Sequence, residues 1–264
     1  MMKDKKAPIP EKKRLLFSML LALLAIVSMV AASVAWFTIA DYTKVRSMSM
    51  EITSGTNLRF DLDSHEIFDD YVKTLSFAQI AERMKKEKGF DMRRSSLEPV
   101  TTSDQVTFFY EDGKEVPKDK GAYLEFVLHF MATQDMVVHL TSSSADGQGG
   151  SAVRSTNRKL PDAMRISFTT SEGTYIYDPG LGDQEVYNGR EKTFGLAEEE
   201  NMILSDKNSM FKLIKNVDKP VTVRIWLEGN DPACTDELRN ADYQISLRFI
   251  GTDEENQVLD GARH

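Results

Sequence analysis

The four histidines are the residues of this chain best able to bind a metal ion or to act as a general base. They are His65, His129, His139 and His264. None belongs to a His-Glu-x-x-His pair, the spacing that places two imidazoles around zinc on one face of a helix. Only His129 and His139 fall in segments that could form neighbouring strands, and a zinc site needs three or four converging ligands. We therefore interpret both as strand histidines and predict neither a metal nor a cofactor.

Nucleophilic catalysis would need an activated serine or cysteine beside a base. The Gly-x-Ser-x-Gly pattern is absent, and Cys234, the single cysteine, lies in the polar segment Asp-Pro-Ala-Cys-Thr-Asp with no histidine nearby in the sequence. One cysteine cannot form an intrachain disulfide. We interpret it as a small buried residue at the start of a helical turn over 235–239, and a reactive or intermolecular thiol is the alternative. No catalytic residue is predicted, so we expect a protein that is not an enzyme.

Two further features could bind ligands. Asp178, Asp183 and Asp231 lie in acidic loops and could offer oxygen atoms to Ca²⁺, but they do not follow the spaced pattern of a calcium-binding loop. We interpret them as solvated turn residues. Trp226 alternates with apolar neighbours, which favours a core or sheet-face aromatic over a platform for a sugar ring. The chain has no glycine-rich phosphate loop and no nucleotide fingerprint.

Strands must position these residues, because apolar side chains after residue 36 recur mainly with a period of two. The clearest segments are 45–52, 58–62, 106–110, 122–132, 136–140, 163–170, 174–177, 221–228 and 243–250. The first two flank Ser54-Gly55-Thr56-Asn57 and predict a β-hairpin. This many short strands predicts a mainly β protein, a jelly-roll-like β-sandwich.

Four stretches depart from the strand pattern. Residues 66–98 show helical spacing and predict a helical insertion, with one helix over about 74–88 that ends at Gly89. A short helix is also expected over 206–214. Residues 141–152 are small, polar and glycine-rich, which predicts an exposed loop. The β-sandwich domain is expected to cover 36–252, followed by a polar, frayed tail at 253–264.

The N-terminal segment combines a basic start with a long apolar run. Six basic residues and two acidic ones lie within the first fourteen positions, and no charged residue occurs from 15 to 40. This order is typical of a bacterial secretory signal. The 26-residue run exceeds an ordinary apolar signal region of roughly 7 to 15 residues and reaches the roughly 20 that span a bilayer. Its length alone does not separate a signal peptide from a membrane anchor.

Small residues at the end of this run favour cleavage. Ser33 and Ala35 occupy the two positions that a signal peptidase reads, which predicts a cut between Ala35 and Trp36. The alternative is an uncleaved single-pass helix that holds the protein in the membrane through residues 15–40, with its basic flank in the cytoplasm. In both cases the C-terminal domain is expected outside the cell, either secreted or on the cell surface.

The charge of the chain limits its partners. The net charge is −8, and it becomes −12 when residues 1–35, with their six basic and two acidic groups, are removed. A strongly acidic surface repels both nucleic acid and anionic lipid headgroups. We therefore expect neither as a partner of the outer domain.

The sequence resembles the TasA and camelysin group of exported proteins of Gram-positive bacteria, which a dedicated signal peptidase processes. The likeness lies in the basic start, the long apolar run, the junction Ala35-Trp36-Phe37-Thr38 and the segment 48–60 with its Ser54-Gly55 turn. Residues 163–168 and 224–229, followed by Asp231-Pro232 and Cys234, are similar to an uncharacterised branch of that group.

The resemblance implies a jelly-roll β-sandwich and a subunit of extracellular matrix fibres, as found in biofilms. It also implies that the mature N-terminal segment is donated as a strand to a neighbouring subunit, with Trp36, Phe37, Ile39 and Tyr42 as its apolar residues. Such β-augmentation is physically sound, because main-chain hydrogen bonds supply affinity and alternate side chains set the register. The alternative is that this strand folds back as an edge of its own sandwich.

Three functions are therefore open. The first is an exported, non-enzymatic surface or matrix protein that associates with itself or with other envelope proteins. The second is a membrane-anchored protein whose outer β-sandwich binds a partner or ligand without polymerising. The third, a secreted hydrolase, has the least support, because no set of residues in the sequence matches a catalytic pattern.

Overall fold

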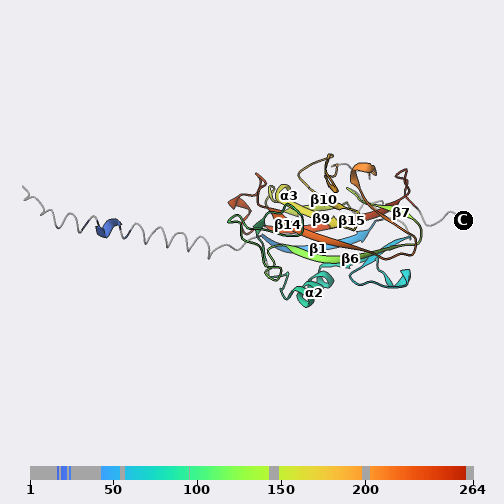
Figure 1. The fold of residues 1–264 in the computed structure, drawn as a ribbon, viewed down its shortest axis with the longest axis horizontal. Helices are drawn as coiled ribbons and strands as arrows, with labels where there is room; N and C mark the ends of the chain where they lie inside the picture. The colour runs from blue at the N-terminus through green and yellow to red at the C-terminus, as the bar shows by residue number, and fades with distance from the viewer. Residues whose placement is uncertain are drawn as a thin grey trace, which may run out of the picture. The chain divides into compact units, whose positions relative to one another are not determined.

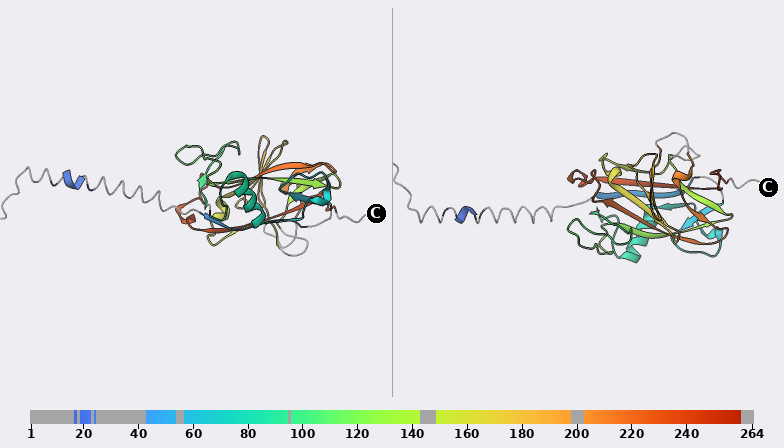
Figure 2. Two further views of the ribbon diagram at one scale, coloured as in Figure 1. Left: turned by 90° about the horizontal axis from the view of Figure 1, so that it is seen from below. Right: turned by 45° about the horizontal axis from the view of Figure 1, so that its top comes forward.

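The computed structural model of this chain shows two mixed β-sheets that face each other across one apolar core (Figures 1 and 2). The structure describes residues 17, 19–22, 24, 43–53, 57–94, 96–142, 149–197 and 203–259. Among these residues, no helix is both long and apolar enough to cross a membrane. The prediction of a mainly β fold is confirmed, and the sheets form a sandwich-like arrangement.

Sheet A contains the first and the last strands of the folded unit as neighbours. Its order is β13-β7-β15-β1-β3, with β4 also paired to β1 and β8 to β15. The strands are β1 (Thr43–Ile52), β3 (Thr74–Ser76), β4 (Ser96–Leu97), β7 (Met136–Leu140), β8 (Ala152–Ser155), β13 (Ser209–Leu213) and β15 (Asp242–Thr252). β1 and β15 run parallel, with Met48 opposite Ile245.

Sheet B has the order β11-β12-β10-β9-β14-β6-β2, with β5 paired to β14. The strands are β2 (Leu58–Asp61), β5 (Pro99–Val100), β6 (Leu124–Ala132), β9 (Met164–Thr169), β10 (Thr174–Tyr177), β11 (Glu185–Asn188), β12 (Glu191–Phe194) and β14 (Lys219–Glu228). β14 lies between β6 and β9 and pairs antiparallel with both. The predicted strands 122–132, 163–170 and 221–228 therefore form the centre of this sheet.

The predicted hairpin over 45–62 is wrong, although both of its strands exist. β1 belongs to sheet A, where it pairs with β15, β3 and β4, whereas β2 belongs to sheet B, where it pairs with β6. The connection between them therefore passes from one sheet to the other. The predicted turn residues Ser54, Gly55 and Thr56 lie outside the described residues.

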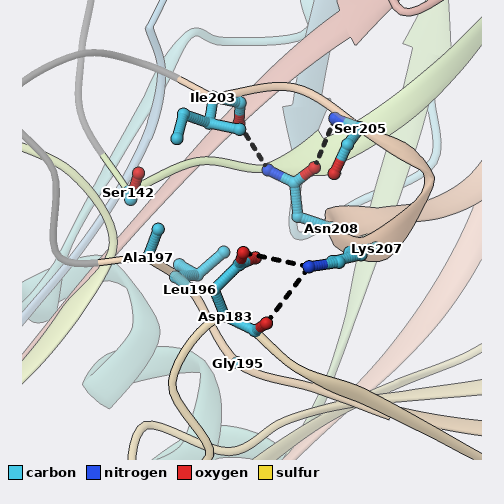
Figure 3. A pocket seen from close by; sticks show the side chains of 9 residues that line it. All are labelled: Ser142, Asp183, Gly195, Leu196, Ala197, Ile203, Ser205, Lys207 and Asn208. Atoms are coloured by element: carbon cyan, nitrogen blue, oxygen red, sulfur yellow. Dashed lines mark hydrogen bonds and ion pairs between the residues drawn. The ribbon is translucent and has the colours of Figure 1, made fainter.

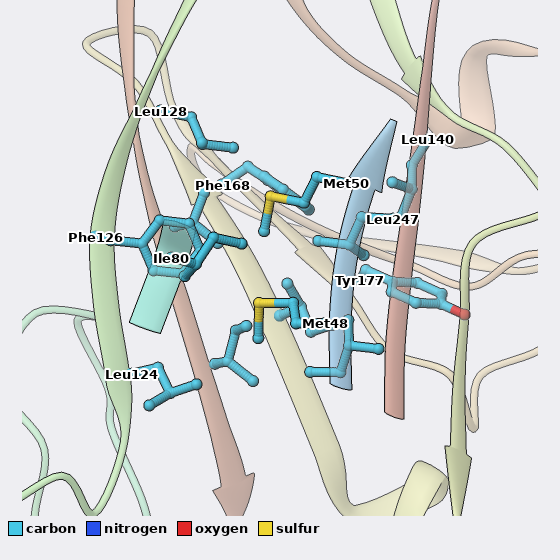
Figure 4. Packing of buried hydrophobic residues seen from close by; sticks show 14 of the residues in the cluster. Met48, Met50, Ile80, Leu124, Phe126, Leu128, Leu140, Phe168, Tyr177 and Leu247 are labelled. Carbon is cyan, nitrogen blue, oxygen red and sulfur yellow. The ribbon is translucent and has the colours of Figure 1, made fainter. Parts of the chain in front are cut away.

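The core between the sheets is filled by the inward side chains of both (Figure 4). Met48, Met50 and Leu247 come from sheet A and pack against Phe126 and Phe168 of sheet B. A group of buried aromatic rings in edge-on contact extends this core: Phe60, Phe130, Phe168, Phe211 and Phe249. Burial of such side chains is the main stabilising contribution to the fold.

A second, smaller apolar cluster lies on the opposite face of sheet B. Trp226 and Ile176 point away from the main core and are covered by Phe108, Val116 and Tyr123. The Phe108 ring stacks on Tyr123 with centroids 4.1 Å apart and meets Trp226 edge-on at 5.5 Å. The prediction of Trp226 as a core aromatic is confirmed. Segment 99–123 thus covers part of the outer face of sheet B.

The predicted strand over 106–110 is wrong. Within it only Phe109 forms bridges, to Thr101 and to Glu115. The chain is instead held as a turn, because the Asp104 carboxylate accepts hydrogen bonds from the backbone amides of Val106 and Thr107 at 2.9 and 2.7 Å. A local side-chain hydrogen bond of this kind competes with strand pairing.

The predicted helix within 66–98 is present as α2 (Phe77–Lys88) and ends at Gly89, whose φ of 79° is the left-handed C-cap conformation. It begins three residues later than expected, because Ser76 caps it in a capping box with Gln79. The residues before the cap form β3, so this range also supplies strands to sheet A. Ile80 and Met84 pack α2 onto the main core beside β6 (Figure 1).

Two further expectations are corrected. Residues 206–214 form a short 3-10 helix, η2 (Asp206–Asn208), followed by the strand β13 and not by more helix. The tail is not frayed over its described part, since Val258 bridges back to Thr252 and Leu259 packs on the core. The remaining short helices are η1 (Phe68–Asp70), α3 (Leu160–Ala163) and η3 (Asp236–Leu238).

Candidate functional site

The residues predicted for signal cleavage and strand donation lie outside the described residues. These are Ser33, Ala35, Trp36, Phe37, Ile39 and Tyr42. The described chain resumes at Thr43, the first residue of β1. Cleavage and strand donation therefore stay predictions.

His129 and His139 do not lie on neighbouring strands, because β6 belongs to sheet B and β7 to sheet A. His139 is buried on β7, with its ring nitrogens 3.3 Å from Asn208 Oδ1 and 3.0 Å from Thr252 Oγ1. Burial lowers the pKa of this imidazole. Among the described residues, no group of three or more histidine, cysteine or acidic side chains is placed to hold a metal ion.

His129 belongs to a network centred on Asp218. Its Nδ1 lies 2.8 Å from Asp218 Oδ2, which also accepts a hydrogen bond from Ser64 Oγ at 2.9 Å. Tyr71 donates to the other carboxylate oxygen at 2.8 Å. The serine contacts the aspartate and not the imidazole, so the order needed to activate a serine nucleophile is absent from this network. We interpret this network as a structural contact that holds segment 64–71 against the start of β14.

Cys234 is half-buried and packs against the main core. Burial, together with the nearby charges of Asp231 and Glu228, raises the pKa of its thiol to about 11. A thiol is a nucleophile only when ionised, so the raised pKa disfavours reaction of this cysteine near neutral pH. The interpretation of Cys234 as a packing residue is supported.

Basic side chains form ion pairs with the aspartates of the acidic loops. Arg165 Nη2 lies 3.0 Å from Asp178 Oδ2 and 2.6 Å from Asp231 Oδ2. Asp183 pairs with Lys207 at 2.9 Å. The expectation of solvated turn residues is wrong for Asp178, which is buried at 8% exposure and whose pKa burial raises. The Arg165 pairs hold the loop after β14 against β9 and β10.

A small recess beside this Asp183–Lys207 pair is lined in part by Asn208 (Figure 3). The Asn208 amide donates to Ile203 O at 2.8 Å and accepts from Ser205 N at 2.9 Å. The recess has a volume of about 10 Å³, which holds at most one water molecule. It is a packing feature of the fold.

A second hollow is an open, polar groove of about 340 Å³ at the outer face of sheet B. This volume is at the lower end of the roughly 300 to 1,000 Å³ of small-ligand pockets. Three chain segments line it: the turn after β5, the β9–β10 turn and the β11–β12 turn. The lining residues are Ser103, Gln105, Thr170, Ser171, Gly173, Thr174, Asn188, Arg190 and Glu191.

The first wall of the groove is set by an unusual backbone conformation. Gln105 has a φ of 53°, a region that residues other than glycine rarely adopt. The Asp104 carboxylate holds the following turn, and the Gln105 amide donates to Glu191 Oε2 at 2.5 Å. This contact joins the turn after β5 to β12. Burial raises the pKa of Glu191, and the hydrogen bond from Gln105 opposes that shift.

The other two walls approach each other at a glycine. A Cβ atom on Gly173 would lie 2.6 Å from the carbonyl oxygen of Arg190, closer than any side chain permits. The neighbouring Thr174 N donates to that same carbonyl at 3.1 Å. β10 and β12 pair in parallel directly below, with Thr174 opposite Glu191. The groove is therefore fixed by a side-chain hydrogen bond at one wall and by a backbone hydrogen bond at the other two.

A row of polar side chains crosses the outer face of sheet B and ends in this groove. Arg224 on β14 donates to Glu125 at 2.7 Å and to Thr169 Oγ1 at 3.4 Å, and the hydroxyls of Thr169 and Thr174 are 3.2 Å apart. Lys88 of α2 completes the row by binding Glu125 at 2.9 Å. Sequence reasoning missed both the row and the groove. Only the alternation of polar residues opposite the core positions could have indicated them.

No family model, no curated protein and no solved structure matches this chain.

Proposed function

We propose that this protein is an exported, non-enzymatic surface or extracellular-matrix protein that assembles by donating the strand Trp36–Tyr42 to a neighbouring copy. The observation that carries this proposal is the open edge of β11. Val186 and Tyr187 on this strand are 55% and 62% exposed, and β11 pairs with β12 alone in the part of the chain that the structure describes. An unprotected edge strand is a template for pairing with another chain.

The contrast with the opposite end of sheet B supports this choice of acceptor. There, Phe60 of β2 exchanges two backbone hydrogen bonds of 3.0 Å with Val72, so the chain covers its own edge. β11 carries one charged residue, Glu185, and no proline or lysine to discourage pairing. The donated segment would supply Trp36, Phe37 and Ile39 as apolar side chains.

The non-enzymatic part of the proposal rests on how the candidate catalytic groups are used. His139 is hydrogen-bonded within the fold, His129 is bound to Asp218, and the Cys234 thiol is kept protonated by its raised pKa. These groups stabilise the sandwich in the geometry described above. A hydrolase would need at least one of them to face a cleft in reach of a base.

The assembly test compares a chain that begins at Trp36 with one that begins at Tyr42. We expect the longer chain to form oligomers in sedimentation velocity and the shorter one to stay monomeric. Val186→Lys should suppress oligomers of the longer chain, because a lysine on an edge strand discourages pairing. Ile214→Lys, also at an exposed apolar residue, is the matched control. Two monomeric chains at high concentration would contradict the proposal.

The second candidate, a protein anchored through residues 15–40 whose outer domain binds a partner, is favoured by the length of the uncharged run. The intact mass of the protein taken from cells separates the two. A species that begins at Trp36 supports cleavage, whereas the mass of the whole chain supports the anchor.

A further inference from the structure

We propose that the groove at the outer face of sheet B is a binding site for an uncharged, hydroxyl-rich saccharide. This site adjoins the assembly edge, because Asn188 ends β11, but it does not depend on strand donation. The proposal begins from the polar groups that the fold leaves unused. In the described part of the chain, the side chains of Ser103, Ser171, Asn188 and Arg190 line the groove and form no hydrogen bond or ion pair.

The type of these groups defines the ligand. Hydroxyl and amide side chains both donate and accept hydrogen bonds, and the guanidinium of Arg190 adds a fork of donors while the Glu191 carboxylate adds acceptors. A ligand whose groups both donate and accept hydrogen bonds satisfies such a mixed set. Each hydroxyl of a sugar both donates and accepts a hydrogen bond. Two neighbouring hydroxyls can bind the two polar atoms of one amide, carboxylate or guanidinium group.

The charge of the site argues against an anionic ligand. Arg190 and Glu191 carry opposite charges within the groove, so the lining has no net charge. The chain as a whole has a net charge of −8, which repels acidic polymers and phosphates. A neutral saccharide avoids this repulsion and can use both charged side chains.

The groove is also held in place before a ligand arrives. The hydrogen bond from Gln105 to Glu191 and the backbone contact between Thr174 and Arg190 fix its walls at opposite sides. A preformed site loses little conformational entropy on binding. No aromatic ring is among the lining residues, so stacking does not contribute and we expect weak binding, with a Kd of about 1 mM.

Saturation-transfer difference NMR on the full chain tests this proposal, because it detects weak ligands of a large particle. The chain is solubilised in a detergent without a sugar headgroup, since a glycoside detergent would compete for the groove. The probes are maltotriose and triacetylchitotriose as uncharged saccharides and trigalacturonate as an acidic one. We expect a saturation signal from at least one uncharged probe and a weaker signal from trigalacturonate.

Arg190→Ala and Asn188→Ala should each weaken that signal about tenfold, because both side chains lack a partner in the fold and removing them leaves the structure intact. Arg94→Ala removes an exposed arginine outside the groove and should leave the signal unchanged. Thermal unfolding checks that each variant is folded, and Ser171→Ala replaces any variant that is not. Absence of signal from both uncharged probes, a stronger signal from trigalacturonate, or a signal that survives all groove substitutions would overturn the proposal.

Discussion

Lys192 illustrates how single buried polar residues join the two sheets. It lies on β12 of sheet B at 5% exposure, yet its amine donates to the backbone carbonyls of Asp206 and Ser209, the latter at 2.9 Å in sheet A. Glu185 lies 3.5 Å away. Burial lowers the pKa of this amine, and the carboxylate opposes that shift.

Replacing Lys192 should therefore destabilise the fold. Lys192→Met keeps the apolar stem but removes the amine that donates to two carbonyls and pairs with a carboxylate, at a cost of about 1 to 3 kcal/mol in the free energy of unfolding. Lys207→Met, which removes an exposed pair with Asp183, should cost less than about 1 kcal/mol. Denaturant unfolding of both variants measures the difference, and equal stabilities would contradict this role.

Because His139 is buried, we predict that the protein loses stability in mild acid. Burial lowers the pKa of His139 in the folded protein below 6.5, so the unfolded chain binds more protons as the pH falls through that value. The contribution of His139 to the free energy of unfolding is complete above pH 6.5. It decreases below that pH, by at most about 1.4 kcal/mol per pH unit. His139→Gln should flatten the stability profile between about pH 6.5 and 5. An unchanged slope in that variant would show that other groups cause the acid response.

Cys234 should react slowly in the folded protein. Its thiol has a pKa raised to about 11, against an ordinary value near 9. At pH 8 the ionised fraction is therefore smaller in the folded chain than in the unfolded chain, and we expect alkylation by iodoacetamide to be slower by about tenfold or more. Mass spectrometry of timed samples, with and without denaturant, gives both rates. Equal rates would restore the reactive-thiol alternative.

At the scale of single elements, strands with clear alternation and the glycine that ends the helix were predictable. The helix end at Gly89, the strands β9 and β10, and the central strands β14 and β15 follow from local pattern alone. The errors lie where local and tertiary preferences differ. The Asp104 side chain turns residues 106–107 out of strand geometry, and contacts with β7 draw residues 209–213 into a strand.

The caps of α2 allow a direct test at this scale. Ser76→Ala removes the side chain of the capping box and should cost about 1 kcal/mol. Gly89→Ala should cost a similar amount, because the φ of 79° disfavours any Cβ although no neighbouring atom blocks it. Thermal unfolding measures the stability of both variants. Glu82→Ala, at a position of the same helix that is not a cap, is the control for loss of a side chain alone. An unchanged stability of Ser76→Ala or of Gly89→Ala would contradict the assigned boundaries of α2.

At the scale of the whole molecule, strand pairing could not be predicted from the sequence. β1 and β15 are almost two hundred residues apart and pair in parallel, and the walls of the groove come from three separate turns. Each turn resembles an ordinary solvated loop in the sequence. Only the parallel pairing of β10 with β12 brings the last two together. The same pairing leaves β11 as the open edge on which the assembly proposal depends.

The most direct test of that proposal is an intermolecular disulfide between the donated strand and β11. Chains that begin at Trp36 and carry Cys234→Ser are prepared with either Ile39→Cys or Val186→Cys, and are mixed under mild oxidation. A disulfide needs the two Cα atoms within about 7 Å, so a mixed dimer should form rapidly if the strand pairs with β11. Ile214→Cys, at an exposed residue outside β11, serves as the control partner. Equal crosslinking to positions 186 and 214, or none to 186, would contradict assembly through this edge.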